Sequence, residues 1–106
     1  MRLADALSVA PVIAIVRLPV REGAERAVAA VVEGGVPAAE IALTTPGALD
    51  ALTNAGAALG DAACLGAGSV RTPTDAARAY AATLAGSTPP VGTSRRSGIG
   101  ASTSRR

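Results

Sequence analysis

The sequence predicts an α/β fold, because short apolar runs alternate with segments that have the spacing of helices. The expected strands are residues 12–16, 38–43 and 63–67. Short, continuous apolar runs of this kind are typical of parallel strands that are covered on both faces. The strands begin about 25 residues apart, the length of one βα unit. We therefore expect three βα units joined by crossover helices.

The first expected helix is indicated by its apolar spacing, and the other two also by signals at their starts. Residues 21–33 carry apolar side chains at helical spacing. For the second helix, Thr45 is the expected N-cap and Pro46 the expected first helical residue. For the third, residues 72–75 (Thr-Pro-Thr-Asp) resemble a capping box, and the helix is expected to end near residue 82.

Composition excludes several classes of site. The 106 residues include no His and no Lys, and Cys64 is the single cysteine. Without His there is no Ser-His-Asp triad and no Cys₂His₂ zinc site, and without Lys there is no Schiff base. We expect no cofactor and no metal. A lone cysteine cannot form an intrachain disulfide and is typical of a cytoplasmic protein. No apolar segment is long enough to span a membrane.

The last 24 residues differ from the rest of the chain. Residues 1–82 carry six Arg and all eight acidic residues, whereas residues 83–106 carry four Arg and no acid. This second segment is rich in Thr, Ser, Gly and Pro and has no apolar period. We expect it to be a low-complexity tail that is disordered or translated out of frame. Because the basic charge belongs to this tail, the first 82 residues offer no specific nucleic-acid surface.

Three polar positions lie at or near the ends of the expected strands. Glu40 lies within an apolar strand, and alternation places it with Ala42 and Thr44 on one face. It is either a strand-edge carboxylate facing solvent or a proton-transferring group at a pocket. Arg17 ends the first strand and is either a solvated cation or a ligand for a carboxylate or phosphate. Ser69 follows Gly-Ala-Gly at the end of the third strand, where glycines permit close approach of a ligand.

Four segments taken together resemble a known family, in both order and spacing. They match the N-terminal part of the 2-keto-3-deoxy-6-phosphogluconate / 4-hydroxy-2-oxoglutarate (KDPG/KHG) aldolases over roughly residues 4–82. The segments are residues 11–17 (Pro-Val-Ile-Ala-Ile-Val-Arg), 33–36 (Glu-Gly-Gly-Val), 40–46 (Glu-Ile-Ala-Leu-Thr-Thr-Pro) and 65–70 (Leu-Gly-Ala-Gly-Ser-Val).

The resemblance implies a partial TIM (β/α)₈ barrel, a homotrimer in the family, and a class I aldolase of the Entner–Doudoroff pathway. Such a lyase cleaves its substrate to pyruvate and an aldehyde. By the same resemblance Glu40 moves protons and Ser69 binds the carboxylate of a pyruvate-type keto acid. Arg17 lies at the pocket rim, and Thr44 and Thr45 are assigned to substrate binding, some members having Arg where this chain has Thr44.

The chain departs from the family pattern at the decisive residue. The family forms an imine between pyruvate and a Lys on its sixth strand, and this chain has no Lys. We therefore expect it to be inactive alone. The alternative is a small half-barrel module that binds an anion or self-associates without catalysis. A different βα protein, such as a phosphate-binding or decarboxylase-like barrel, is a third alternative, which residues 40–46 disfavour.

Overall fold

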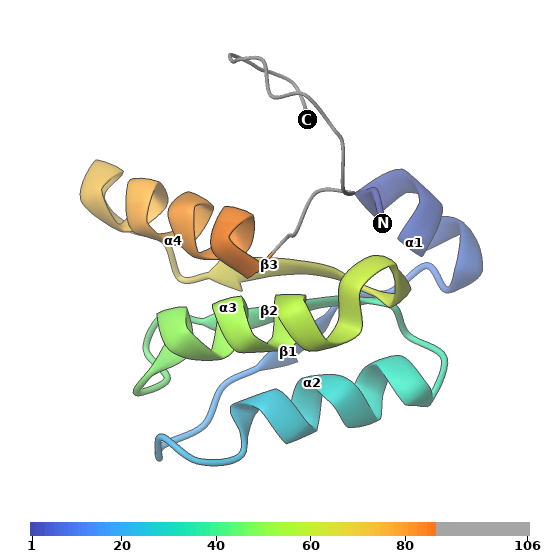
Figure 1. The fold of residues 1–106 in the computed structure, drawn as a ribbon, viewed down its shortest axis with the longest axis horizontal. Helices are drawn as coiled ribbons and strands as arrows, with labels where there is room; N and C mark the ends of the chain where they lie inside the picture. The colour runs from blue at the N-terminus through green and yellow to red at the C-terminus, as the bar shows by residue number, and fades with distance from the viewer. Residues whose placement is uncertain (87–106) are drawn as a thin grey trace.

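Three parallel strands form one sheet in the structure, a computed structural model that describes residues 1–86 (Figure 1). Each strand is followed by a helix, which confirms the prediction of three βα units. In chain order the elements are α1 (Leu3–Val9), β1 (Ala14–Val16), α2 (Ala24–Glu33), β2 (Ala38–Ala42), α3 (Ala48–Leu59), the 3₁₀ turn η1 (Gly60–Ala62), β3 (Cys64–Gly68) and α4 (Pro73–Gly86).

The strands lie in the order β1-β2-β3, with β2 in the centre. Ile15, Glu40 and Gly66 form one row across the sheet. Since side chains alternate along a strand, the neighbouring row, which contains Ile41, points to the opposite face. Glu40 and Ile41 therefore face different environments although they are adjacent in sequence.

The core lies between the sheet and the helices α2 and α3. Ile41, Val28 and Leu52 are the largest apolar side chains that are fully buried there. Most of the remaining buried positions are alanines, which bury little apolar area each but let helices approach the sheet closely. The helix-facing side of the sheet is thus well covered by small residues.

The start of α3 differs from the expectation. Thr45 and Pro46 were predicted as N-cap and first helical residue, but the helix begins at Ala48 and its N-cap is Gly47, at φ 74°. The reason is that the Thr45 hydroxyl is already used: it accepts a hydrogen bond from the Leu18 N–H at 3.1 Å. Thr45 consequently joins β1 to β2 rather than starting α3.

The start of α4 agrees with the sequence. The Thr72 hydroxyl accepts a hydrogen bond from the Asp75 N–H at 3.0 Å, and the helix begins at Pro73. The helix continues to Gly86 rather than ending near residue 82. The rest of the predicted tail, residues 87–106, lies outside the described residues.

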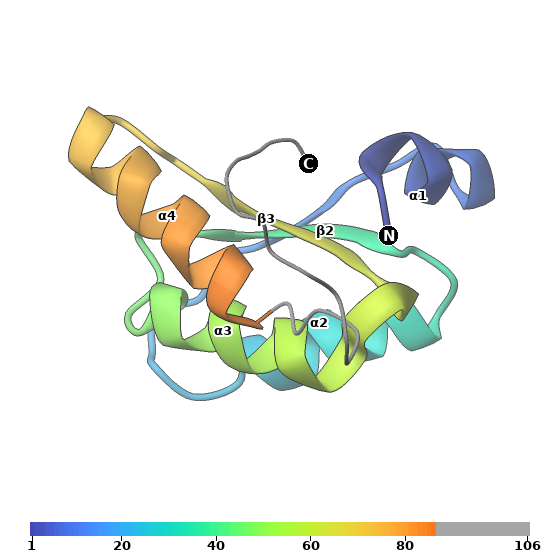
Figure 2. The ribbon, with the colours of Figure 1, turned by 45° about the horizontal axis from the view of Figure 1, so that its top comes forward.

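The two faces of the sheet are covered unequally. Helices α2, α3 and α4 lie on one side, whereas α1, which the sequence analysis did not predict, lies near the end where the strands begin (Figure 2). The face that carries Ile15 is open at β1, where Ile15 is 61% exposed, whereas Ala38 and Ala42 of β2 on the same face are buried. Among the described residues, the helices are all too short or too polar to cross a membrane.

Replacing Thr45 with Val should lower the free energy of unfolding by about 1–3 kcal/mol, because the part-buried Leu18 N–H loses its acceptor. Denaturant unfolding measures the loss. Thr44→Val is the matched control, since Thr44 is exposed and its change should stay within about 0.5 kcal/mol. Equal losses in the two variants would show that the Thr45 hydroxyl does not join the strands.

Candidate functional site

The candidate site lies where the three strands end, on the face that α2 and α3 do not cover. Arg17 directly follows β1, Thr44 lies two residues after β2, and Ser69 directly follows β3. Parallel register brings these three positions to one edge of the sheet. The carboxyl ends of parallel strands are where α/β proteins place their ligands.

Arg17 links the ends of all three strands. Its Nη1 donates a hydrogen bond to Thr44 Oγ1 at 2.9 Å, and its Nη2 donates one to Ser69 Oγ at 3.2 Å. A guanidinium has five N–H donors, so these two bonds leave others for a ligand. Within residues 1–86, no carboxylate forms an ion pair with Arg17. The positive charge is therefore available to an anion.

Ser69 is held in an unusual backbone conformation. Its φ is 58°, and among the described residues it is the one non-glycine residue with positive φ. This left-handed region costs an L-residue roughly 1–2 kcal/mol. Strained conformations of this kind cluster at ligand sites. Here the strain accompanies a turn that directs the Ser69 hydroxyl toward Arg17.

The Glu40 carboxylate is directed along the sheet toward the end of β3. Glu40 is half-buried and pairs in register with Gly66. Its Oε1, however, lies so close to Gly68 that a Cβ atom built there would be 2.6 Å away. The carboxylate thus reaches the residue before Ser69. Among residues 1–86, Glu40 and Arg17 form no ion pair with each other, so the carboxylate and the guanidinium are both left for a ligand.

The remaining predicted residue, Thr45, is not brought into this group. It is 2% exposed, and alternation turns it away from Thr44, toward the helix side. Its hydroxyl holds the backbone of Leu18, the residue after Arg17. This hydrogen bond therefore fixes the backbone just after β1, next to the residue that carries the Arg17 side chain.

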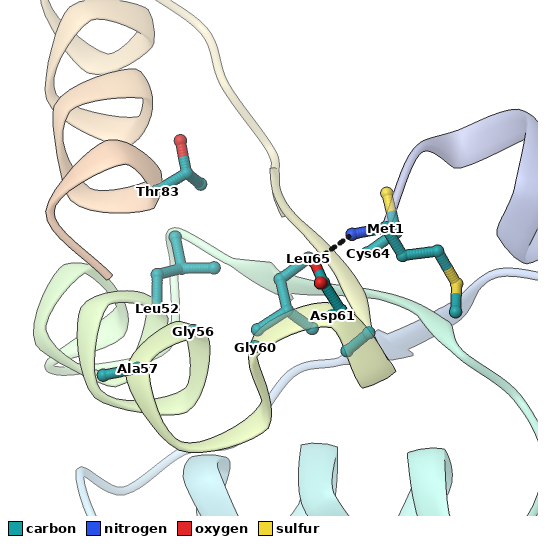
Figure 3. Close-up of a pocket in the computed structure, with 10 residues that line it drawn as sticks. Met1, Leu52, Gly56, Ala57, Gly60, Asp61, Cys64, Leu65 and Thr83 are labelled. Carbon is teal, nitrogen blue, oxygen red and sulfur yellow. Dashed lines mark ion pairs between the residues drawn. The ribbon is translucent and has the colours of Figure 1, made fainter. Parts of the chain in front are cut away.

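Two cavities lie in the described part of the molecule, one away from this group and one beside it at Thr44. One, of about 330 Å³, is lined by Cys64, Leu65 and Leu52, and beside it the Met1 amino group lies 3.6 Å from Asp61 (Figure 3). It lies where β3 begins, at the opposite end of the strand from Ser69. The other, of about 430 Å³, is lined by residues 43–50 together with Asp75 and Arg78. Arg17, Glu40 and Ser69 line neither cavity, whereas Thr44 lines the second.

Metal binding has no candidate in this part of the molecule: residues 1–86 contain no group of three or more His, Cys, Asp or Glu side chains placed to hold an ion. The arrangement instead combines a cation, two hydroxyls and a separate carboxylate. Such a set can bind a small carboxylic acid through the cation and exchange a proton through the carboxylate.

The role of Gly68 in the site was not predicted from the sequence. Gly68 was noted as part of a glycine-rich turn, but its contact with Glu40 was not foreseen. The signal was present: alternation places Gly66 and Gly68 on one face of β3, beside the strand that carries Glu40. Which of the two glycines the carboxylate approaches depends on the side-chain conformation of Glu40.

Comparison with known proteins gave one match, to a family model. No curated protein and no solved structure matched the chain. A family model described as "Aldolase: KDPG and KHG aldolase" matches residues 3–91, which confirms the resemblance and extends it beyond residue 82. Since this match spans most of the chain and includes all three strand ends with Arg17, Glu40 and Ser69, the protein belongs to the KDPG and KHG aldolase family.

Proposed function

We propose that this chain supplies the part of an aldolase site that binds the keto acid and moves its proton. The family reaction is the cleavage of 2-keto-3-deoxy-6-phosphogluconate or 4-hydroxy-2-oxoglutarate to pyruvate and an aldehyde. The observation that carries the proposal is the Arg17 guanidinium, which joins Thr44 and Ser69 and, within residues 1–86, forms no ion pair, while the Glu40 carboxylate lies against Gly68, the residue before Ser69.

Arg17 and Ser69 are proposed to hold the substrate carboxylate. A guanidinium matches a carboxylate through two parallel hydrogen bonds, and such charged bonds are stronger than neutral ones. The hydroxyls of Ser69 and Thr44 lie within 3.2 Å of the guanidinium nitrogens, so an anion bound there meets all three side chains. This contact orients the acid with respect to the sheet.

In a complete site, where an imine at the keto carbon would accept the electron pair, Glu40 is proposed to exchange the proton at the neighbouring carbon. Its carboxylate lies on the same face as Thr44 and reaches the strand end beside Ser69. Class I aldolases withdraw electrons from that carbon through an imine, which requires a primary amine on the enzyme. The 106 residues contain no lysine, so we propose that this chain binds the keto acid without cleaving the aldol.

Two further proposals concern the complete assembly and its compartment. A site on one face of three strands is incomplete unless more chain covers it, and we propose that the complete architecture is the (β/α)₈ barrel and homotrimer of the family. The single cysteine favours a reducing compartment, and we propose the cytoplasm.

Pyruvate should bind the 106-residue protein at the strand ends. In ¹H–¹⁵N spectra we expect pyruvate to shift the signals of Arg17, Thr44 and Ser69. Arg17→Gln should weaken binding about 10- to 100-fold, because it removes a charged hydrogen-bond donor. Arg26→Gln is the control, since Arg26 is exposed on α2, away from this face. Equal affinity in wild type and Arg17→Gln would refute the assignment.

The same protein should not cleave 2-keto-3-deoxy-6-phosphogluconate. Treatment with pyruvate and borohydride should leave no adduct on any side chain by mass spectrometry, because no side chain offers a primary amine. A lysine-containing aldolase of the family serves as the positive control. Turnover by the purified chain, or an adduct on a side chain, would contradict the proposal.

A second candidate, self-association without catalysis, is favoured by the exposed apolar residues. Ile13 and Ile15 are 46% and 61% exposed, and Val70 is also exposed. Exposed apolar groups that adjoin one another mark association surfaces. The uncovered sheet face around Ile15 is therefore proposed to pair with a second copy of the chain.

Sedimentation at increasing protein concentration should then reveal oligomers that Ile15→Thr weakens. Val20→Thr is the matched control, since Val20 is also exposed but lies in the loop before α2. A chain that stays monomeric across the concentration range would exclude self-association through this face.

A further inference from the structure

The two glycines of β3 that share a face with Glu40 occupy different surroundings. A Cβ atom added at Gly66 would meet nothing within 4 Å. One added at Gly68 would lie 2.6 Å from Oε1 and 3.1 Å from Cδ of Glu40. Neither glycine has a positive φ, so backbone conformation does not require glycine at either position.

The register makes this difference informative. Glu40 pairs with Gly66, and Gly68 pairs with Ala42, two residues nearer the strand ends. The carboxylate nevertheless lies against Gly68 rather than in the open space above Gly66. Its direction along the sheet is therefore toward the edge where Arg17 and Ser69 meet.

Contact with Gly68, and not polar bonding, accompanies this placement. Within residues 1–86, no hydrogen bond or ion pair holds the Glu40 carboxylate. A glutamate side chain with no such restraint samples several rotamers, and the space that neighbours leave decides among them. A missing Cβ at position 68 leaves room at the strand end.

The backbone at Gly68 is itself anchored. Its carbonyl accepts a hydrogen bond from the Leu43 N–H at 2.9 Å, and Gly68 is the last residue of β3. A side chain added there would consequently push against the flexible end of Glu40 more readily than against the strand. The substitution would move the carboxylate and preserve the sheet.

We propose that Gly68 is a positioning residue, whose missing side chain lets the Glu40 carboxylate lie at the strand ends beside the Arg17–Ser69 pair. This inference rests on the proposed function for its consequence: the acid bound by Arg17 then meets the proton-transferring group. With Ala at position 68, the carboxylate turns away from the strand end, and the open space above Gly66 can receive it.

The test compares Gly68→Ala with Gly66→Ala in the full 106-residue chain. Both add one methyl group to the same face of the same strand, and only the first meets Glu40. With ¹³C-labelled glutamate, the Glu40 carboxyl signal is assigned by its loss in Glu40→Gln. We expect Gly68→Ala to shift this signal and to abolish the nuclear Overhauser contact between the Glu40 γ protons and residue 68. Gly66→Ala should preserve both.

Pyruvate supplies a readout that a purely structural role for Gly68 would not change. In the wild type, bound pyruvate should shift the signals of Arg17, Ser69 and Glu40. In Gly68→Ala the Arg17 and Ser69 shifts should persist while most of the Glu40 shift is lost. An unchanged Glu40 response, or equal effects of the two glycine variants, would overturn the inference.

The outcomes separate this inference from the proposed function. If pyruvate shifts no signal in the wild type, the proposed function fails, whereas a moved Glu40 signal in Gly68→Ala still supports the positioning role. If Gly68→Ala lowers the unfolding midpoint, adding Glu40→Ala should restore it, because the clash partner is gone. No restoration would place the strain elsewhere and overturn the inference.

Discussion

The parallel register of three short strands is the constraint on which the rest of this structure depends. It places Ile15, Glu40 and Gly66 in one row and brings the residues after each strand to one edge. Arg17 can then donate to both Thr44 and Ser69, which are far away in sequence. A shift of one residue in β2 would turn Glu40 into the core and Ile41 into solvent, so burial of Ile41 enforces the register.

The difference between the apolar face and the polar face of the sheet follows from this register. On one face, small apolar side chains pack under α2 and α3, and Thr45 joins β1 to β2 from that side. The other face carries a cation, hydroxyls and a half-buried carboxylate. Packing under the helices and the polar groups at the strand ends are therefore carried by alternate residues of the same strands.

The polar face is held together by contacts of different strength. The bonds of Arg17 to Thr44 and Ser69 are direct, whereas Glu40 is placed by the space that Gly68 leaves. Within residues 1–86 Glu40 and Arg17 do not pair with each other, so the polar atoms of both remain for other partners. Under the proposed function this arrangement has a chemical purpose, because the cleavage of a keto acid needs both an anion-binding group and a proton acceptor.

Local patterns were sufficient to predict a large part of the molecule. Alternation of apolar strands and helical segments determined the three βα units, and the Thr72 signal determined where α4 begins. Alternation alone also placed Glu40 and Thr44 on one face, because side-chain direction in a strand depends only on position. The residues that follow the three strands could be predicted as site residues, because parallel strands all end at one edge of the sheet.

Tertiary contacts decided what no local pattern contains. Thr45 has the sequence of an N-cap, yet the Leu18 N–H, 27 residues away, takes its hydroxyl, and α3 begins at Ala48 instead. Gly66 and Gly68 are alike in sequence, yet only Gly68 meets the Glu40 carboxylate. The sequence by itself determined which residues face together, because alternation is local. Only the tertiary structure decided which of them touch, because those contacts join segments that the fold brings together.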